Sequence, residues 1–318
     1  MRFAVYLPLL AAATLGACAP ALSRRLPPAT GTRLLTGSAV LAAAATSFVL
    51  AVLAFTLVGQ LPLVATLGHW SGSTLAAATP VPAVGAAAAL LTGSALAVAT
   101  ARAVLIRARA MIAARALCQR LGGRPGQLVV IDDDAIDAFA VPAAGGGRIV
   151  ASRLLLQSLP PAERRAVLTH ESAHLAHHHH LYRLAAELAA AVNPLLRPVA
   201  RGVHYTSERW ADEVAAATVG DRKTVATALA RTSLNSRART GERRDACAPT
   251  RLAITGPTTV ARVQALLRPA PQPRRGLVLG VLALLAATLL ASGEIQRDTE
   301  HLFKHVMRTS IALTAPEI

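Results

Sequence analysis

Long stretches without charge are the feature that most constrains what this chain can fold into. A helix needs about 20 consecutive apolar residues to cross the ~30 Å hydrocarbon layer of a membrane. Stretches of about this length occur repeatedly, and they are rich in Ala and Gly, which allow membrane helices to approach one another closely. They cover residues 3–22, 38–58, 81–104 and 276–292. The sequence therefore predicts a multi-pass membrane protein.

The charge distribution supports this interpretation and argues against a nucleic-acid-binding protein. Of the 318 residues, 16% are charged, compared with about 25% in soluble proteins, and the formal net charge is +16. A basic nucleic-acid-binding surface would require clustered Lys and Arg with interleaved aromatic residues. Here aromatic residues make up 3% of the chain, no Asp or Glu precedes Asp132, and the arginines of that half flank the apolar stretches.

The arginines also predict an orientation in the membrane. Loops on the cytoplasmic side carry an excess of Lys and Arg. The loop between the second and third stretches has none, whereas the other flanks carry Arg24, Arg25, Arg33, Arg102, Arg107, Arg109, Arg115, Arg268, Arg274 and Arg275. We therefore expect a protein of the cell membrane, with the N-terminus and the C-terminal tail outside and residues 107–275 in the cytoplasm.

The first apolar stretch has a second interpretation. Leu15-Gly16-Ala17-Cys18 resembles the cleavage box of a bacterial lipoprotein, which would make the preceding residues a signal peptide. Arg24 and Arg25 follow closely and disfavour export, so a first membrane helix is the favoured reading. The three cysteines lie far apart and predict neither a disulfide framework nor a cysteine metal site.

The expected organisation has four parts and belongs to the mainly α class. Residues 1–106 hold three membrane helices (3–22, 38–58 and 81–104), 107–272 form a cytoplasmic domain, 273–293 hold a fourth membrane helix, and 294–318 are a short tail. Within the cytoplasmic domain, three β-branched runs bounded by turn residues predict a small β-sheet or hairpin at 128–131, 138–141 and 148–151. Helices are expected at 107–121, 162–192, 205–219, from 223 onward and at 251–267, with a polar loop at 237–248.

The segment His170-Glu171-Ser172-Ala173-His174 carries the main chemical signal. It lies within a predicted helix, where residues i and i+4 share a face, so His170 and His174 can bind one Zn²⁺. Glu171 is then placed to take a proton, as general base, from a water that the metal activates.

A third protein ligand is needed, and two residues are candidates. Glu208 lies on a later predicted helix with Asp212 one turn further, where Asp212 can accept a hydrogen bond from a ligating histidine. The other candidate is His180, although the HExxHxxxxxH pattern usually requires a glycine where this chain has His177. Of the histidine run 177–180, His179 is expected to assist the site.

These motifs resemble those of membrane-bound zinc metallopeptidases of the gluzincin type, in particular the HtpX and CAAX-protease group and the BlaR/MecR-type peptidases. The matching segments are 137–142, 148–151, 166–175 with His179, and 208–212. The resemblance implies a zincin-like helical domain that binds one Zn²⁺ through His170, His174 and Glu208, with Glu171 as the base. It also implies that the strand Ala138, Phe139 and Ala140 aligns an extended peptide by β-addition.

The sequence thus predicts a membrane-anchored zinc endopeptidase that cleaves a membrane-proximal or regulatory protein. The alternative is a non-catalytic membrane sensor or scaffold with a degenerate peptidase domain. The expected partners are a protein or peptide substrate and the lipid bilayer, with no nucleic acid. The tail 294–318 is too short for the penicillin-binding sensor domain of BlaR proteins, so antibiotic sensing is not expected. Neither the substrate nor the oligomeric state follows from the sequence.

Overall fold

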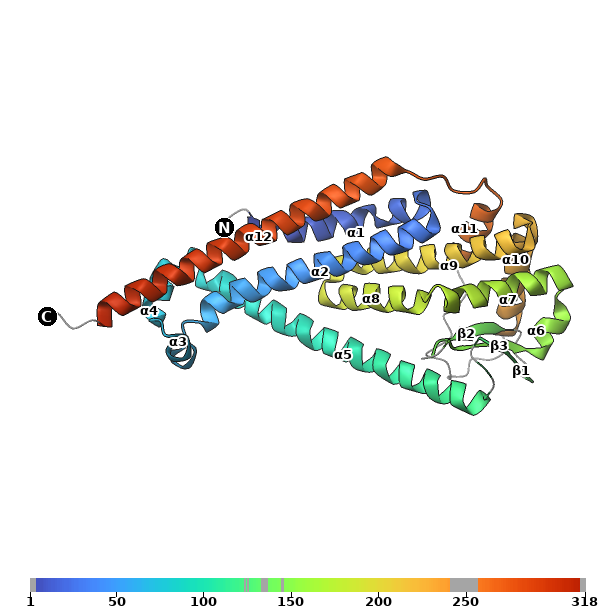
Figure 1. The fold of residues 1–318 in the computed structure, drawn as a ribbon, viewed down its shortest axis with the longest axis horizontal. Helices are drawn as coiled ribbons and strands as arrows, with labels where there is room; N and C mark the ends of the chain where they lie inside the picture. Colours follow the sequence, from blue (N-terminus) through green and yellow to red (C-terminus); the bar gives the residue numbers. More distant parts are fainter. Residues whose placement is uncertain are drawn as a thin grey trace.

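The computed structural model describes residues 4–122, 124, 126–132, 137–143, 146–240 and 257–314. Long helices dominate it, and a small sheet lies at one end (Figure 1). Among the described residues, four helices are long and apolar enough to cross a membrane: α1 (Leu7–Arg25), α2 (Pro28–Val58), α5 (Ala83–Leu121) and α12 (Arg275–Thr314). The mainly α, multi-pass fold class predicted from the sequence is therefore confirmed.

Several of these helices extend beyond the apolar stretches that predicted them. The helix α2 begins at Pro28, because proline suits the first turn of a helix. The helix α5 runs on through the arginine-rich stretch and ends at Gly122, whose φ of +64° suits glycine. The helix α12 continues through most of the expected tail to Thr314. A short helix η1 (Ala4–Tyr6) precedes α1, and α3 (Pro62–Gly68) and α4 (Gly72–Ala78) connect α2 to α5.

The small sheet contains the three strands expected from the sequence, β1 (Leu128–Ile131), β2 (Ala138–Val141) and β3 (Arg148–Ser152). Their spatial order is β1-β3-β2. The strands β2 and β3 form an antiparallel pair, with Phe139 opposite Val150, whereas β1 pairs with β3 in parallel. This order leaves β2 at one edge of the sheet, and α7 packs beside that edge (Figure 1).

The helix expected over 162–192 is in fact two helices, α7 (Pro161–Ala176) and α8 (His179–Val192). The expectation that nothing between Leu175 and His180 interrupts the helix was wrong. His178 adopts a left-handed conformation, with φ of +51°. The break reorients the chain, so that the first residue of α8, His179, turns back toward His174 on α7.

The remaining helices follow the expected order with shifted bounds. They are α6 (Arg153–Ser158), η2 (Pro194–Leu196), α9 (Arg197–Val219), α10 (Arg222–Thr240) and α11 (Pro257–Leu266). The helix α9 begins eight residues earlier than expected, with Pro198 in its first turn. The helix α10 extends into the expected loop 237–248. The rest of that loop and the start of the helix expected at 251–267 lie outside the described residues.

One apolar core joins the helices before and after residue 107. The buried residues of α8, η2 and the first half of α9 pack against α1 and α2, with Val281 of α12 at the margin. The core consists of Ala12, Leu15, Ala19, Leu22, Leu26, Leu35, Ala39, Ala42, Ala43, Ala186, Ala189, Ala190, Leu196, Val199, Ala200, Val203 and Val281. The expected boundary between a membrane part and a cytoplasmic domain is therefore crossed by a shared core.

Gly16 permits the closest approach within this core. A Cβ atom at Gly16 would lie 2.3 Å from the carbonyl oxygen of Leu195, a separation that side chains do not tolerate. The turn between α8 and α9 therefore rests directly on the backbone of α1.

We expect Gly16→Ala to destabilise the protein by about 1–3 kcal/mol, because the added methyl group must push α1 away from Leu195. Gly37→Ala on α2 is the matched control, since its Cβ would meet nothing within 4 Å. Removing a glycine from a helix is expected to leave stability unchanged or raise it by up to about 1 kcal/mol. Thermal unfolding of the detergent-purified variants measures both effects. A Gly16→Ala protein as stable as Gly37→Ala would contradict the close contact.

Candidate metal centre

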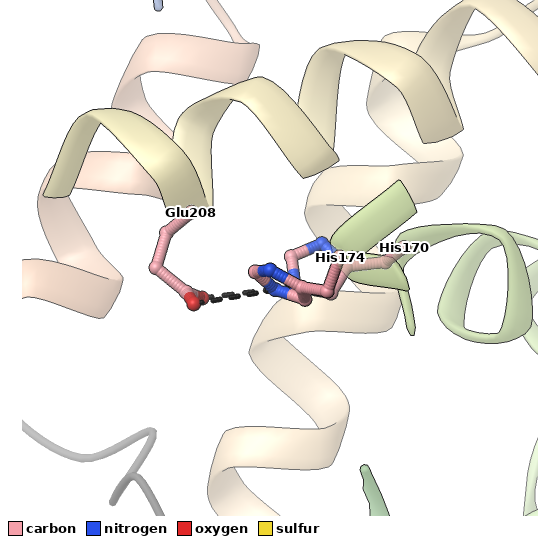
Figure 2. Close-up of side chains that lie close together, drawn as sticks. All are labelled: His170, His174 and Glu208. Atoms are coloured by element: carbon pink, nitrogen blue, oxygen red, sulfur yellow. Dashed lines mark hydrogen bonds and ion pairs between the residues drawn. The ribbon is translucent and has the colours of Figure 1, made fainter. Parts of the chain in front are cut away.

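Side chains from two helices converge at one point beside the sheet. His170 and His174 lie one turn apart on α7, and Glu208 projects toward them from α9 (Figure 2). The two Nε2 atoms are 3.1 Å apart. A Glu208 oxygen lies 3.7 Å from Nε2 of His170, and the other lies 3.4 Å from Nε2 of His174. A search of the described residues for histidine, cysteine and acidic side chains close enough to hold one metal ion finds His170, His174 and Glu208.

These separations fit a tetrahedral zinc site. Zinc binds histidine nitrogen and carboxylate oxygen at about 2.0–2.2 Å, so donor atoms around one tetrahedral ion lie roughly 3.3–3.6 Å apart. The separations of 3.1, 3.4 and 3.7 Å lie close to this range, with a different Glu208 oxygen nearest to each histidine. Two imidazoles and one carboxylate are also the donor set of many catalytic zinc sites, which leave the fourth position open. The residues present therefore fit the ion.

Both histidines are oriented through their second ring nitrogens. Nδ1 of His170 lies 3.0 Å from Oδ1 of Asp212, one turn after Glu208 on α9. Nδ1 of His174 lies 2.8 Å from Nδ1 of His179, whose ring is buried. Partners of this kind select the tautomer and direct the other nitrogen, Nε2, toward a metal. Asp212 and His179 thus lie where residues supporting the histidines are expected.

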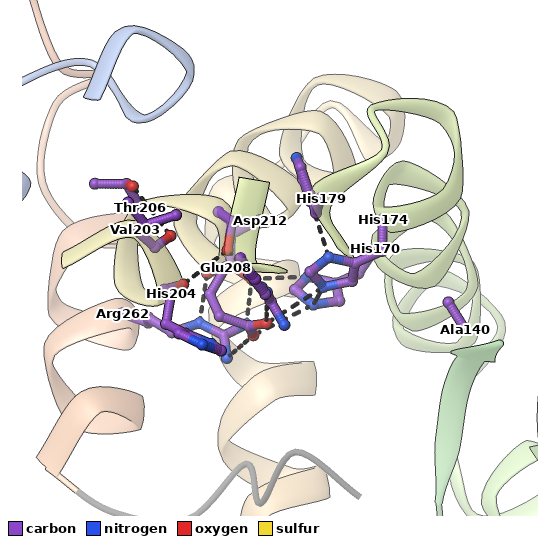
Figure 3. A network of polar contacts seen from close by, with 12 residues as sticks. Ala140, His170, His174, His179, Val203, His204, Thr206, Glu208, Asp212 and Arg262 are labelled. Atoms are coloured by element: carbon purple, nitrogen blue, oxygen red, sulfur yellow. Dashed lines mark hydrogen bonds and ion pairs between the residues drawn. The ribbon is translucent and has the colours of Figure 1, made fainter. Parts of the chain in front are cut away.

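Two arginines neutralise Glu208. The guanidinium of Arg183 on α8 contacts one carboxylate oxygen at 2.5 Å and also donates to Ser207 Oγ. Arg262 on α11 contacts the other oxygen at 2.6 Å, and it binds Asp212 through two further bonds of 2.7 and 2.8 Å (Figure 3). Arg262 is 4% exposed and is buried together with Asp212, whereas the side chain of Glu208 is 20% exposed. Neither arginine was predicted from the sequence to belong to the site.

A signal for Arg262 does exist in the sequence. It is the single charged residue in the segment 257–266, which forms an otherwise weakly polar helix. A lone charge in such a helix is usually paired when it is buried. The partner, however, lies 50 residues earlier in the chain, so the pairing itself could not be read from spacing.

Burial and these ion pairs shift the pKa values in opposite directions. Burial alone would raise the pKa of Asp212, but Arg262 and His170 lower it to about 2, and Arg262 and Arg183 hold the pKa of Glu208 well below its usual range. Burial lowers the pKa of His174 to about 4 and that of His179 to about 2. For His170, the hydrogen bonds with Asp212 and Glu208 outweigh burial and raise its pKa to about 10.

Glu171 follows His170 on α7 and reaches the sheet with its side chain. Its carboxylate is 6% exposed and accepts a hydrogen bond of 2.9 Å from the backbone N–H of Ala140 on β2. Burial raises the pKa of Glu171 to about 7, although the neighbouring His170 opposes the shift. The strand segment Ala138, Phe139 and Ala140 thus lies directly beside the glutamate of the motif.

The alternative third ligand His180 and two polar residues of α9 do not join the cluster. His180 is absent from the group close enough to bind one ion, and its nearest ring contact is His178 at 6.0 Å. His204 hydrogen-bonds to Glu187. Arg209 donates to the carbonyls of Ser23 and Arg24 and stacks over Tyr205. None of these three residues belongs to the His170–His174–Glu208 group.

Two histidines and a glutamate that converge beside the glutamate of an HExxH motif point to the class of zinc metallopeptidases. The profile of the family described as Peptidase family M48 matches residues 100–192 and 183–270, more than half of the 318 residues. The chain belongs to peptidase family M48, which confirms the membrane-bound zinc metallopeptidase family expected from the motifs. No curated protein and no solved structure gives a significant match.

Replacing Arg262 tests how strongly the centre depends on its buried ion pairs. We expect Arg262→Leu to cost about 3–5 kcal/mol of stability, because it leaves the buried carboxylates of Asp212 and Glu208 without this cation. The control is Arg153→Leu, whose partner Asp132 forms an exposed pair on the surface. That variant should unfold like the wild type. Equal, small shifts in thermal unfolding for both variants would show that Arg262 does not stabilise the centre.

Proposed function

We propose that this M48 metallopeptidase is a membrane-anchored endopeptidase that hydrolyses peptide bonds in a membrane-proximal or regulatory protein. The observation that carries the proposal is the position of Glu171. Its buried carboxylate accepts a hydrogen bond from the edge strand β2, and it adjoins in sequence His170, one of the three candidate zinc ligands. The proposed base would thereby lie next to both the candidate metal ligands and the proposed peptide-binding edge.

His170, His174 and Glu208 are proposed to hold one Zn²⁺, oriented by Asp212 and His179. When bound, zinc would supply Lewis acidity toward the peptide carbonyl and would lower the pKa of a coordinated water. Glu171 is proposed to accept the proton of the attacking water and to deliver it to the leaving amine. A pKa of about 7 in the protein suits a group that gains and loses a proton near neutral pH.

The strand β2 is proposed to align the substrate. One edge of β2 pairs with β3, and the N–H of Ala140 points from the other edge to Glu171. An extended peptide that pairs with this second edge gains backbone hydrogen bonds and passes directly over the base. We place this chemistry on the cytoplasmic side, because the arginines that flank the apolar helices favour that orientation.

Metal content tests the ligand set. We expect one zinc per chain in the purified wild type, and loss of the zinc in His170→Ala and Glu208→Ala, because each removes one of three ligands. His180→Ala is the matched control and should retain zinc. Loss of zinc in His180→Ala but not in Glu208→Ala would reject the proposed ligand set. A correctly folded wild type without zinc would favour the non-catalytic sensor instead.

Glu171→Gln tests the base separately from the ligands. The amide keeps the size of the side chain but cannot accept the proton, so cleavage of a casein substrate should fall by about 10²–10⁴-fold. Zinc content and thermal stability should stay close to those of the wild type. Undiminished cleavage in Glu171→Gln would overturn the assigned role.

A further inference from the structure

Trp210 lies between Glu208 and Asp212 in the sequence but on a different face of α9. Glu208 and Asp212 are one turn apart and share a face, whereas Trp210 is directed about 200° around the helix from Glu208. Even so, Trp210 is 8% exposed. Neither the candidate zinc ligands nor the proposed base accounts for a buried aromatic residue at this position.

The rings that cover Trp210 belong to the break between α7 and α8. The ring of His177 stacks on it, with centroids 4.6 Å and planes 24° apart, and the ring of His179 lies 4.9 Å away. These two histidines flank His178, the residue with the left-handed φ of +51°. A non-glycine residue keeps such a conformation when the surrounding contacts impose it. Trp210 supplies contacts of this kind on both sides of the break.

His179 transmits the contact to a candidate zinc ligand. Its Nδ1 lies 2.8 Å from Nδ1 of His174 (Figure 3). For Nε2 of His174 to bind a metal, Nδ1 of the same ring must carry the proton and donate it to His179. The direction of the His174 ring therefore depends on where the His179 ring presents its Nδ1.

Among the described residues, packing rather than a second hydrogen bond holds the His179 ring. Its other nitrogen, Nε2, is buried and has no hydrogen-bond partner there. Rotation of the imidazole is restricted by the rings beside it, Trp210 at 4.9 Å and His177 at 5.8 Å. Removing the larger of these rings would leave the imidazole free to tilt away from His174.

Trp210 is itself held from the side of α2. The guanidinium carbon of Arg33 lies 4.8 Å from the centre of the Trp210 ring, within the range of a cation–π contact. The neighbouring residue on α2, Thr32, donates through Oγ1 to Oγ1 of Thr206 on α9, at 2.9 Å. Two consecutive residues of α2 thus fasten the part of α9 that carries the tryptophan.

We propose that Trp210 is a positioning residue of the metal centre. Stacked with His177, it holds the ring of His179 in place. That ring in turn directs Nε2 of His174 toward the metal. The inference rests on the proposed zinc site, in which His174 is a ligand, and it adds a residue that touches no ligand itself.

The zinc affinity of the detergent-purified full chain tests the proposal. Trp210→Leu removes the aromatic ring and keeps an apolar side chain, whereas Trp210→Phe keeps a smaller ring. Trp70→Leu is the matched control, because Trp70 also packs among rings, those of Phe55 and Phe303, at the opposite end of α2. Competition with a chromophoric chelator gives the zinc dissociation constant. The visible absorption of the Co²⁺-substituted protein reports the coordination geometry.

We expect Trp210→Leu to weaken zinc binding by about 10–100-fold, the loss typical for residues that support metal ligands. The Co²⁺ spectrum should change with it, and Trp210→Phe should lie between Trp210→Leu and the wild type. Trp70→Leu should keep the affinity and the spectrum of the wild type, even where it lowers the unfolding temperature. Equal zinc affinities of Trp210→Leu and the wild type would overturn the proposal.

A double variant separates an action through His179 from a general disturbance of the fold. His179→Ala should weaken zinc binding by itself. Adding Trp210→Leu to it should cause little further loss, because the ring that Trp210 holds is then absent. Independent losses that multiply in the double variant would show that Trp210 does not act through His179.

Size-exclusion chromatography and thermal unfolding check that each variant folds. If Trp210→Leu does not fold, His177→Leu takes its place, since it removes a stacked ring without altering α9. It should weaken zinc binding several-fold, and an unchanged affinity would then overturn the proposal. A folded wild type that binds no zinc would reject the proposed ligand set and this inference with it. A wild type that binds zinc as tightly as Trp210→Leu would reject the role of Trp210 alone.

Discussion

The metal centre depends on the balance of charge around two buried carboxylates. Glu208 and Asp212 lie one turn apart on α9, and both are largely withdrawn from water. Two like charges in such a place repel each other and lose hydration. Arg262 offsets both costs, because one planar guanidinium binds the two carboxyl groups at once. Glu208 can then face the histidines in its ionised form, which is the form a metal ligand requires.

The same balance has a consequence for metal binding. In the described structure Arg183 and Arg262 each hold one oxygen of Glu208. A cation bound by Glu208, His170 and His174 would have to share that carboxylate with a guanidinium. Arg262 has Asp212 as an additional partner with two bonds, whereas Arg183 has the neutral Ser207. Arg183 is therefore the more easily released of the two cations.

Local patterns made part of this structure predictable. The i, i+4 spacing of His170 and His174 follows from helix geometry alone, and the alternation of turns and β-branched runs located all three strands. The later Glu208–Asp212 pair could be proposed because its own spacing matches one helical turn. What could not be predicted depends on contacts between distant segments. The pairing of Arg262 with Asp212, the parallel β1–β3 pair and the left-handed His178 leave no periodic trace in the sequence.

The division of the chain at residue 107 has the same limitation. Apolar spacing in α8 indicates that one face is buried, but it does not identify the element that covers it. Here the covering helices are α1 and α2, and α2 ends at Val58, 121 residues before α8 begins at His179.

The helix α9 connects the membrane-type core to the chemistry. Its first half contributes Val199, Ala200 and Val203 to the core shared with α1 and α2, and its second half carries Glu208 and Asp212. Because α9 is one continuous helix, the packing of its first half against the core fixes the position of the carboxylates in its second half. His170 and His174 arrive on a different helix, α7, which contributes no residue to that core. The left-handed turn at His178 separates α7, which packs beside the sheet, from α8, which packs in the apolar core. It lets α8 follow the apolar core while α7 remains beside the sheet, with its histidines facing α9.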